Sequence, residues 1–131
     1  MIIRTEGLPW PIDPRLRHIL QAATADVPVG KGAIINFRDP SYDDCGGFHP
    51  VEVGLTSDGR LLYISDFAHV GRAPDTELVK EIDFDFALGL FGHFAIDYPI
   101  KQGRKLFTIW QSNFLAYFEM DAYVVSVELM G

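Results

Sequence analysis

The pair Asp58-Gly59 constrains the fold of this chain more than any other feature of its sequence. It lies between two apolar runs, residues 48–56 and 60–67. An Asp-Gly pair in such a place predicts a β-hairpin, because both central residues of its tight turn need a positive φ. If these two residues form the whole loop, the register is fixed, and these pairs share the core side: Leu55 with Leu62, Val53 with Ile64, and Val51 with Asp66.

The opposite side of this hairpin mixes polar and apolar residues. It carries Glu52, Tyr63 and Ser65, among others. We expect this side of the sheet to meet water, and we expect Tyr63 to take part in an interaction there.

Two segments have apolar residues at helical spacing. The first begins with Asp13-Pro14, an N-cap residue followed by a proline at the first helical position, where a missing N–H costs nothing. The second covers residues 104–119, and its wide aromatic stripe suggests a helix that lies flat on a sheet. The first stripe is Leu16, Ile19, Leu20 and Ala23, and the second is Leu106, Ile109, Trp110, Asn113, Phe114 and Tyr117, widened by Phe107 and Phe118.

Three further segments are typical of strands. Residues 33–38 are rich in β-forming side chains, residues 78–88 alternate between apolar and largely acidic side chains, and residues 122–129 form a β-rich end. Residues 90–96 are ambiguous, and a short helix is one interpretation of them. The order of elements predicts a single α+β domain over residues 1–131. Its two layers are a mainly antiparallel sheet of about five strands and, packed on one face, an N-terminal helix and one or two C-terminal helices.

The balance of charge argues against nucleic acid as a partner. The chain has 11 basic and 18 acidic residues, a formal net charge of −7, and its basic residues are scattered. Phosphate backbones are bound by clustered lysine and arginine. We therefore expect no nucleic-acid partner.

The sequence also favours a cytoplasmic location. Its N-terminus lacks the basic start and apolar run of a secretory signal. No stretch approaches the roughly 20 uncharged apolar residues that span a membrane. The single cysteine, Cys45, forms no internal disulfide, and a free thiol suits a reducing compartment. We expect a cytoplasmic protein that does not bind a membrane.

Four stretches of the sequence together resemble a known family. They are residues 47–53 (Gly-Phe-His-Pro-Val-Glu-Val), residues 58–67, residues 80–86 (Lys-Glu-Ile-Asp-Phe-Asp-Phe), and residues 106–114, with Leu-Phe, Trp and Asn-Phe. The family consists of small bacterial proteins and is known as domain of unknown function family 2787. The resemblance covers residues 34–129. It implies a compact α+β domain, carries no assigned activity and transfers no catalytic residue.

His49 and Asp66 are the most informative pair of ionisable residues. In the predicted register they are diagonal neighbours on the core side, about 7–8 Å apart at Cα. One interpretation is a satisfied ion pair or a cap at the strand ends, because an aspartate on a core-facing side needs a partner. The other is an acid–base pair at the mouth of a pocket, near Cys45 in a flexible loop. Asp43 and Asp44 oppose a nucleophilic Cys45, since negative neighbours raise the pKa of a thiol.

The sequence shows no spacing typical of a metal or cofactor site. No two histidines lie four residues apart on one helix, there is no His-x-His, and no glycine-rich phosphate loop is present. We expect no cofactor and no metal centre. Whether the acidic loop at residues 39–44, or the strand face with Asp83 and Asp85, holds a cation is left open.

These observations favour a non-catalytic protein-interaction or ligand-binding domain. Its partner would be another protein, a peptide or a second copy of the chain, bound through aromatic surface or the free edge of the strand at residues 123–129. Trp10, which lies between two prolines and outside any periodic element, is the best candidate for an exposed aromatic residue. The alternative is a small enzyme that uses His49 and Asp66, near Cys45.

Overall fold

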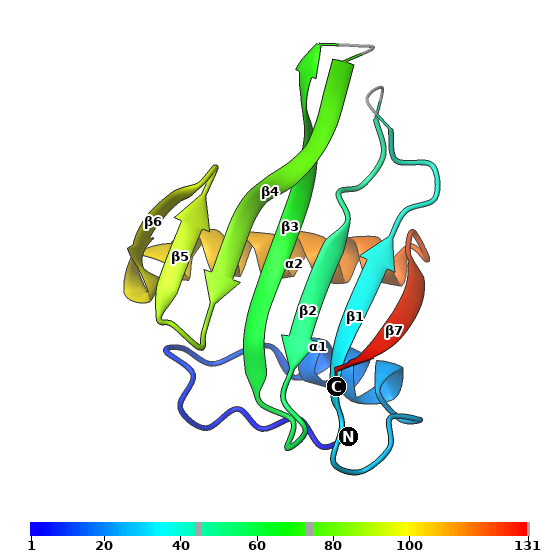
Figure 1. Cartoon of the computed structure of the whole chain (residues 1–131), viewed down its shortest axis with the longest axis vertical. Coiled ribbons are helices and arrows are strands. Elements are labelled where there is room, and N and C mark those ends of the chain that lie inside the picture. Colours follow the sequence, from blue (N-terminus) through cyan, green and yellow to red (C-terminus); the bar gives the residue numbers. More distant parts are fainter. Residues whose placement is uncertain (44–45, 73–74, 131) are drawn as a thin grey trace.

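An antiparallel sheet forms the centre of the fold (Figure 1). The structure, a computed structural model, describes residues 1–43, 46–72 and 75–130. Within these residues the sheet has seven strands in the order β6-β5-β4-β3-β2-β1-β7. The elements in chain order are α1 (Pro14–Ala23), β1 (Gly32–Arg38), β2 (Val51–Leu55), β3 (Leu61–Arg72), β4 (Asp75–Asp85), β5 (Leu90–His93), β6 (Ile96–Pro99), the 3-10 turn η1 (Ile100–Gly103), α2 (Arg104–Glu119) and β7 (Val124–Met130).

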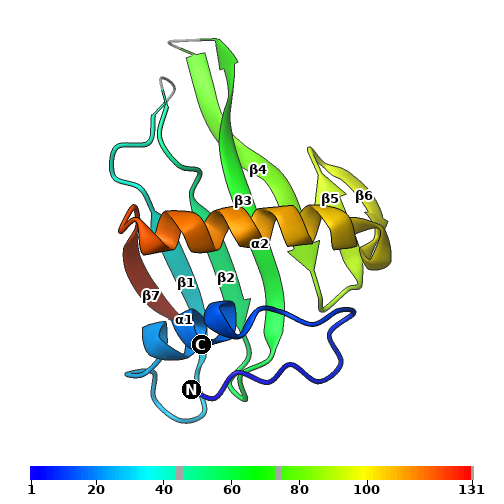
Figure 2. The same ribbon diagram turned by 180° about the vertical axis from the view of Figure 1, so that it is seen from behind.

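The α-helices of the described chain cover one face of this sheet (Figure 2). α2 crosses the sheet near its middle, and α1 lies to one side of α2, near both chain ends. The core fills the space between the two layers, as expected for the predicted α+β architecture. Its largest buried side chains include Ile35, Phe37, Ile64 and Phe84 from the sheet and Phe107 and Phe114 from α2.

Both predicted helices form. α2 spans the range that the periodicity predicts. At the start of α1 the Asp13 carboxylate accepts a hydrogen bond from the backbone N–H of Arg15 at 2.8 Å, which satisfies a free N–H of the first turn. α2 has 16 residues, and no helix in the described part of the chain is long and apolar enough to cross a membrane. The cytoplasmic location stays a prediction.

The sheet has more strands than the sequence predicts, seven in the described chain instead of about five. The two additional strands are β5 and β6, which pair with each other, while β5 also pairs with β4. The short helix considered for residues 90–96 is therefore wrong. Phe94 and Ala95 form the turn between these strands with φ of 47° and 68°, values that a right-handed helix does not contain.

The hairpin at Asp58-Gly59 forms, but its loop is longer than predicted. Among the described residues of this turn only Gly59 has a positive φ, 84°, whereas the two-residue turn needs two such residues. Thr56 donates from its backbone N–H to the Arg60 carbonyl at 2.9 Å, which closes a three-residue loop. The pairs Val53–Ile64 and Val51–Asp66 are confirmed, whereas Leu55 pairs with Leu61 instead of Leu62, beside an irregularity in the ladder.

Trp10 is buried, so the expectation of an exposed aromatic residue is wrong. The residue is 5% exposed. The indole packs against Phe84, Phe86 and Phe107, with ring centroids 5.2–6.4 Å away. The prolines favour an extended backbone, and this extended segment places the indole ring in the core between the sheet and the helices. Trp10 therefore exposes very little of its surface to a partner, and its part in an interaction stays a prediction.

Tyr63 lies on the face of the sheet that points away from the helices. Its hydroxyl donates a hydrogen bond to Glu52 Oε2 at 2.8 Å. Two residues further along β3, Ser65 Oγ donates to Asp83 Oδ1 at 2.6 Å. Burial, and next the hydrogen bond to Glu52, raises the pKa of Tyr63. Its part in an interaction stays a prediction.

Candidate functional site

A β-bulge in β4 turns one acidic side chain toward the helices. Two successive residues of β3, Asp66 and Phe67, pair with residues of β4 that are two apart, which leaves Glu81 as an extra residue. In a regular strand Glu81 would share a face with Asp83, as the alternation over residues 78–88 predicts. The bulge interrupts this alternation, and the Glu81 carboxylate lies within reach of Asp66 and His49. The prediction that Glu81 and Asp83 share one solvent-exposed face of the sheet is therefore wrong.

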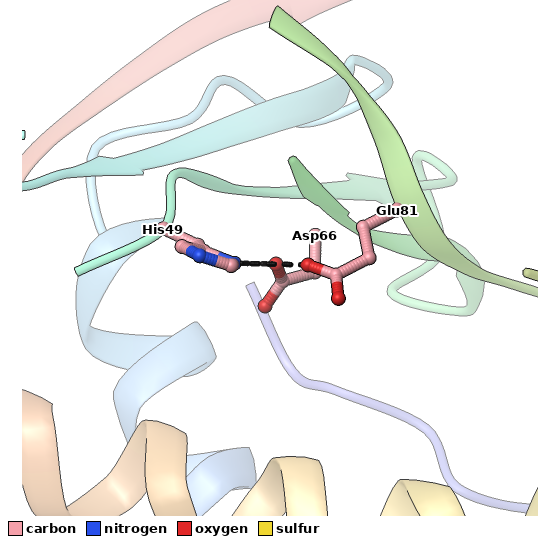
Figure 3. A group of neighbouring side chains, drawn as sticks. All are labelled: His49, Asp66 and Glu81. Carbon is pink, nitrogen blue, oxygen red and sulfur yellow. Dashed lines mark hydrogen bonds and ion pairs between the residues drawn. The ribbon is translucent and has the colours of Figure 1, made fainter. Parts of the chain in front are cut away.

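Three ionisable side chains meet at this bulge (Figure 3). His49 Nδ1 lies 3.0 Å from Asp66 Oδ1 and 3.1 Å from Glu81 Oε2. His49 comes from the segment before β2, Asp66 from β3 and Glu81 from β4. We call them the His49–Asp66–Glu81 cluster. The structure thus brings together the two residues that the sequence pairs and adds a third.

Asp66 is the most buried member of the cluster, with its side chain 13% exposed. Trp110 of α2 donates from Nε1 to Asp66 Oδ2 at 3.1 Å. Burial raises the pKa of Asp66 to about 6, His49 opposes this rise, and the negative Glu81 adds to it. One carboxylate oxygen is therefore held by the helix, and the other faces His49.

Contacts with described residues on either side of positions 44–45 fix the position of His49. Asp39 Oδ2 accepts a hydrogen bond from the backbone N–H of Phe48 at 2.9 Å. Gly47 has a φ of 106°, and a Cβ there would lie 2.7 Å from Cα of Tyr42, so the loop needs glycine at this point. The ring of Tyr42 packs beside the His49 imidazole, with centroids 5.4 Å apart. These contacts hold the imidazole against the two carboxylates.

A pocket of about 280 Å³ opens between α2 and the sheet, next to the cluster. The sequence predicts that the aromatic stripe of α2 packs into the core. Trp110 and Phe114 are indeed buried, but Ile109 is 58% exposed. The α2 residues that line the pocket are those of the predicted stripe: Leu106, Ile109, Trp110, Asn113, Phe114 and Tyr117. The rest of the lining comes from Gly47, Phe48, Ile82, Tyr123 and the cluster.

Aromatic rings make up much of this lining. Phe48 and Tyr117 stack with centroids 4.1 Å apart, and Phe114 stacks on Tyr123 at 5.4 Å. Burial, and next the charge of Asp66, raises the pKa of Tyr123. Among the described residues, those that line the pocket include no lysine or arginine. The pocket therefore combines a flat apolar wall with an end rich in carboxylate oxygens.

The other residues singled out in the sequence lie elsewhere. Cys45 lies outside the described residues, so its relation to the cluster stays a prediction. The question of a cation in the loop at residues 39–44 stays open. Tyr63 is on the opposite face of the sheet. Asp83 and Asp85 each accept a hydrogen bond from another residue of the chain, and the question of a cation on this strand face stays open.

Glu81 and Trp110 belong to the site although the sequence does not single them out for it. Glu81 looks like one acidic residue of a solvated strand, and Trp110 looks like a core residue. Asn113 is the one available signal, because a polar amide in the middle of an apolar stripe indicates that this helix face is not entirely core.

Two solved structures from Vibrio cholerae are similar to this chain. The hypothetical protein VC0508 from the VSP-II pathogenicity island is 36% identical to it with a TM-score of 0.79, and the match covers 96% of this chain and 98% of that one. The conserved hypothetical protein VC1805 from pathogenicity island VPI-2 is 36% identical with a TM-score of 0.74, covering 96% and 99%. VC1805 is described as sharing structural homology with the human P32 protein. No curated protein matches the chain. A family model described as "Protein of unknown function (DUF2787)" matches residues 12–128.

Proposed function

The chain belongs to the DUF2787 family of proteins of unknown function, as the resemblance in its sequence predicts, and we propose that it is a non-catalytic domain that binds a small molecule in the pocket between α2 and the sheet. The observation that carries this proposal is the pairing of an aromatic wall with the His49–Asp66–Glu81 cluster in one pocket. Concave sites with apolar walls and a few convergent polar groups are typical of small-molecule binding.

The size and lining of the pocket indicate the kind of ligand. A volume of about 280 Å³ is near the lower limit for ligand pockets, which begin at about 300 Å³. A ligand with one aromatic ring system and one polar group therefore fits better than a larger molecule. The ring would lie against Phe48, Trp110 and Tyr117, since aromatic side chains bind flat rings by offset or edge contacts. The polar group would face the cluster.

Indole, benzoate and benzylamine test this proposal, because they share an aromatic ring and differ in charge. The chain has two tryptophans, of which Trp110 lines the pocket and Trp10 lies in the core. In ¹H–¹⁵N spectra of the metal-free protein, we expect at least one probe to move the Trp110 indole resonance in a saturable manner, with a clearly smaller shift at Trp10.

Two phenylalanine variants of α2 complete this test. Asn113→Phe places a ring in the pocket, and we expect it to weaken probe binding by at least about tenfold, a loss of about 1.4 kcal/mol. Ser112→Phe adds the same ring at an exposed neighbour outside the lining and should bind like the parent. The proposal is contradicted if no probe moves Trp110, or if both variants bind as the parent does.

We also propose that the outer edge of β7 pairs with β7 of a second copy. β7 ends the described sheet, and Val124, Val125, Val127 and Leu129 along it are exposed. A long apolar edge strand is a template for pairing. In an antiparallel register centred on Val127, each Glu128 would face Ser126, so no like charges meet. Analytical ultracentrifugation should show that the parent chain is a dimer. Val127→Lys should dissociate this dimer, whereas Leu88→Lys, at an exposed residue that follows β4, should preserve it. A monomeric parent chain would refute the pairing of β7 strands.

The enzyme alternative has one supporting observation, the 3.0 Å contact between His49 Nδ1 and Asp66 Oδ1. An aspartate in this position orients an imidazole whose other nitrogen is free to exchange protons with a substrate. The third group of this hypothesis, Cys45, lies outside the described residues. The acid–base role of the pair therefore stays a prediction beside the binding proposal.

A further inference from the structure

We infer that the His49–Asp66–Glu81 cluster binds a divalent first-row transition metal ion, and that a ligand in the pocket completes its coordination with an oxygen donor. The second half of this inference rests on the proposed function and names the chemistry of its ligand. The first half concerns the cluster alone and is tested separately.

The donor atoms suit such an ion. The cluster offers one imidazole nitrogen and two carboxylate groups, and the three donor atoms lie within 4.8 Å of one another. Imidazole with carboxylate is a common donor set for Mn²⁺, Fe²⁺ and Zn²⁺, whereas Mg²⁺ and Ca²⁺ are usually held by oxygen alone. The single nitrogen donor therefore points to a transition ion.

The distances within the cluster also agree with coordination. Two donors about 2.1 Å from an ion and at right angles to each other are about 3.0 Å apart. His49 Nδ1 lies 3.0 Å from Asp66 Oδ1 and 3.1 Å from Glu81 Oε2.

Hydrogen bonding alone leaves the cluster short of positive charge. His49 Nδ1 carries at most one hydrogen, so it can donate a full hydrogen bond to one carboxylate only. The other carboxylate is left without a full hydrogen bond from the imidazole. With both carboxylates ionised, the cluster is net negative whether or not His49 carries a positive charge. Among the described residues, the pocket lining supplies no lysine or arginine to balance them. A divalent cation resolves both deficits at once.

The surroundings of the cluster resemble the outer shell of a metal site. Trp110 Nε1 holds Asp66 Oδ2 at 3.1 Å and leaves Oδ1 facing His49. Hydrogen bonds of this kind orient metal-binding carboxylates. Because the cluster lies on the pocket wall, an ion held by the three protein donors would have its remaining coordination positions open to the pocket. An aromatic carboxylate would place its ring on the aromatic wall and its oxygen on the ion.

Titration of the metal-stripped protein with Mn²⁺, followed by the electron paramagnetic resonance of the free ion, tests the first half. We expect one equivalent to bind, and Glu81→Gln to weaken binding by at least about tenfold. Asp83→Asn, two residues along β4 on the opposite face, should bind as the parent does. His49→Gln provides a second loss variant if Glu81→Gln fails to fold. The inference is wrong if the parent binds no Mn²⁺, or if Glu81→Gln and Asp83→Asn bind alike.

Benzoate and indole test the second half and separate the two proposals. With Mn²⁺ bound, we expect benzoate to bind about fivefold or more tightly than without it, and indole, which has no oxygen donor, to bind equally in both conditions. Binding of indole at Trp110 without any Mn²⁺ binding would leave the proposed function standing and overturn the metal inference. Mn²⁺ binding without any aromatic probe at Trp110 would support the metal site and overturn the proposed function.

Discussion

Replacement of Phe84 by alanine is expected to lower the free energy of unfolding by about 3–5 kcal/mol, the usual range for a fully buried phenylalanine. Phe84 is 0% exposed and lies at the centre of the aromatic core. Its ring contacts Trp10, Phe91, Phe107 and Trp110, with centroids 5.1–6.4 Å away. Since whole domains are stable by about 5–15 kcal/mol, this single substitution should remove a large part of the stability of the protein.

Urea denaturation of Phe84→Ala and Leu88→Ala measures this difference. The sequence alternation puts Phe84 and Leu88 on one side of a strand, but Leu88 follows the end of β4 and is 73% exposed. We expect Leu88→Ala to change the free energy of unfolding by no more than about 0.5 kcal/mol. A loss below about 1 kcal/mol for Phe84→Ala, or equal losses for both variants, would contradict the packing described for this core.

Replacement of Asp66 by asparagine is expected to change how the stability of the protein depends on pH. Burial raises the pKa of Asp66 to about 6 from its ordinary value of 3.8, with His49, Glu81 and Tyr123 as its ionisable neighbours. Between pH 3.8 and about 6, Asp66 is therefore protonated in the folded protein and ionised in the unfolded chain. The stability that Asp66 contributes is fully present below pH 3.8 and is lost as the pH rises through about 6.

The size of this effect is about 3 kcal/mol, because each pKa unit corresponds to about 1.4 kcal/mol. Urea denaturation in the presence of EDTA, over about pH 3.5–7.5, measures this change in the free energy of unfolding. We expect the parent to lose stability relative to Asp66→Asn over this range, since asparagine mimics the protonated acid and does not titrate. Asp83→Asn keeps Asp66 and should follow the parent. Parallel curves for the parent and Asp66→Asn would show that Asp66 ionises as an ordinary exposed acid.

The helices could be predicted from the sequence because their signals are local. The cap at Asp13, the proline after it and the period of residues 104–119 each act within a few residues of chain. The strands were predictable where apolar alternation is regular. β5 and β6 were not, because Phe94 and Ala95 adopt positive φ without the glycine or asparagine that normally marks such a turn.

Burial by distant parts of the chain explains the error at Trp10. Its neighbours in sequence are two prolines, which predict an extended segment. They do not indicate which residues cover the indole. The aromatic residues that bury the indole come from β4, the turn after it and α2, which are 70 or more residues away in the sequence. Only the tertiary structure brings these rings together.

The sequence predicted two of the site residues, His49 and Asp66, but not Glu81 and Trp110. The register of the hairpin places Asp66 on the core side and near His49, and the structure has the two in contact. Glu81 was hidden because a bulge has no reliable signature in a single sequence, and a shift of one residue moves a side chain to the other face. Trp110 was hidden because a ring that lines a pocket has the same helical spacing as one in the core.

The metal site requires the Glu81 carboxylate to lie on the face of the sheet that α2 covers, and a crystal structure of the Mn²⁺-soaked protein determines its side. We predict that the Glu81 carboxylate lies with His49 and Asp66 beneath α2, with the anomalous signal of the ion between them. A Glu81 side chain beside Asp83 and Ser65 on the face away from the helices, in a β4 strand without the bulge, would contradict it.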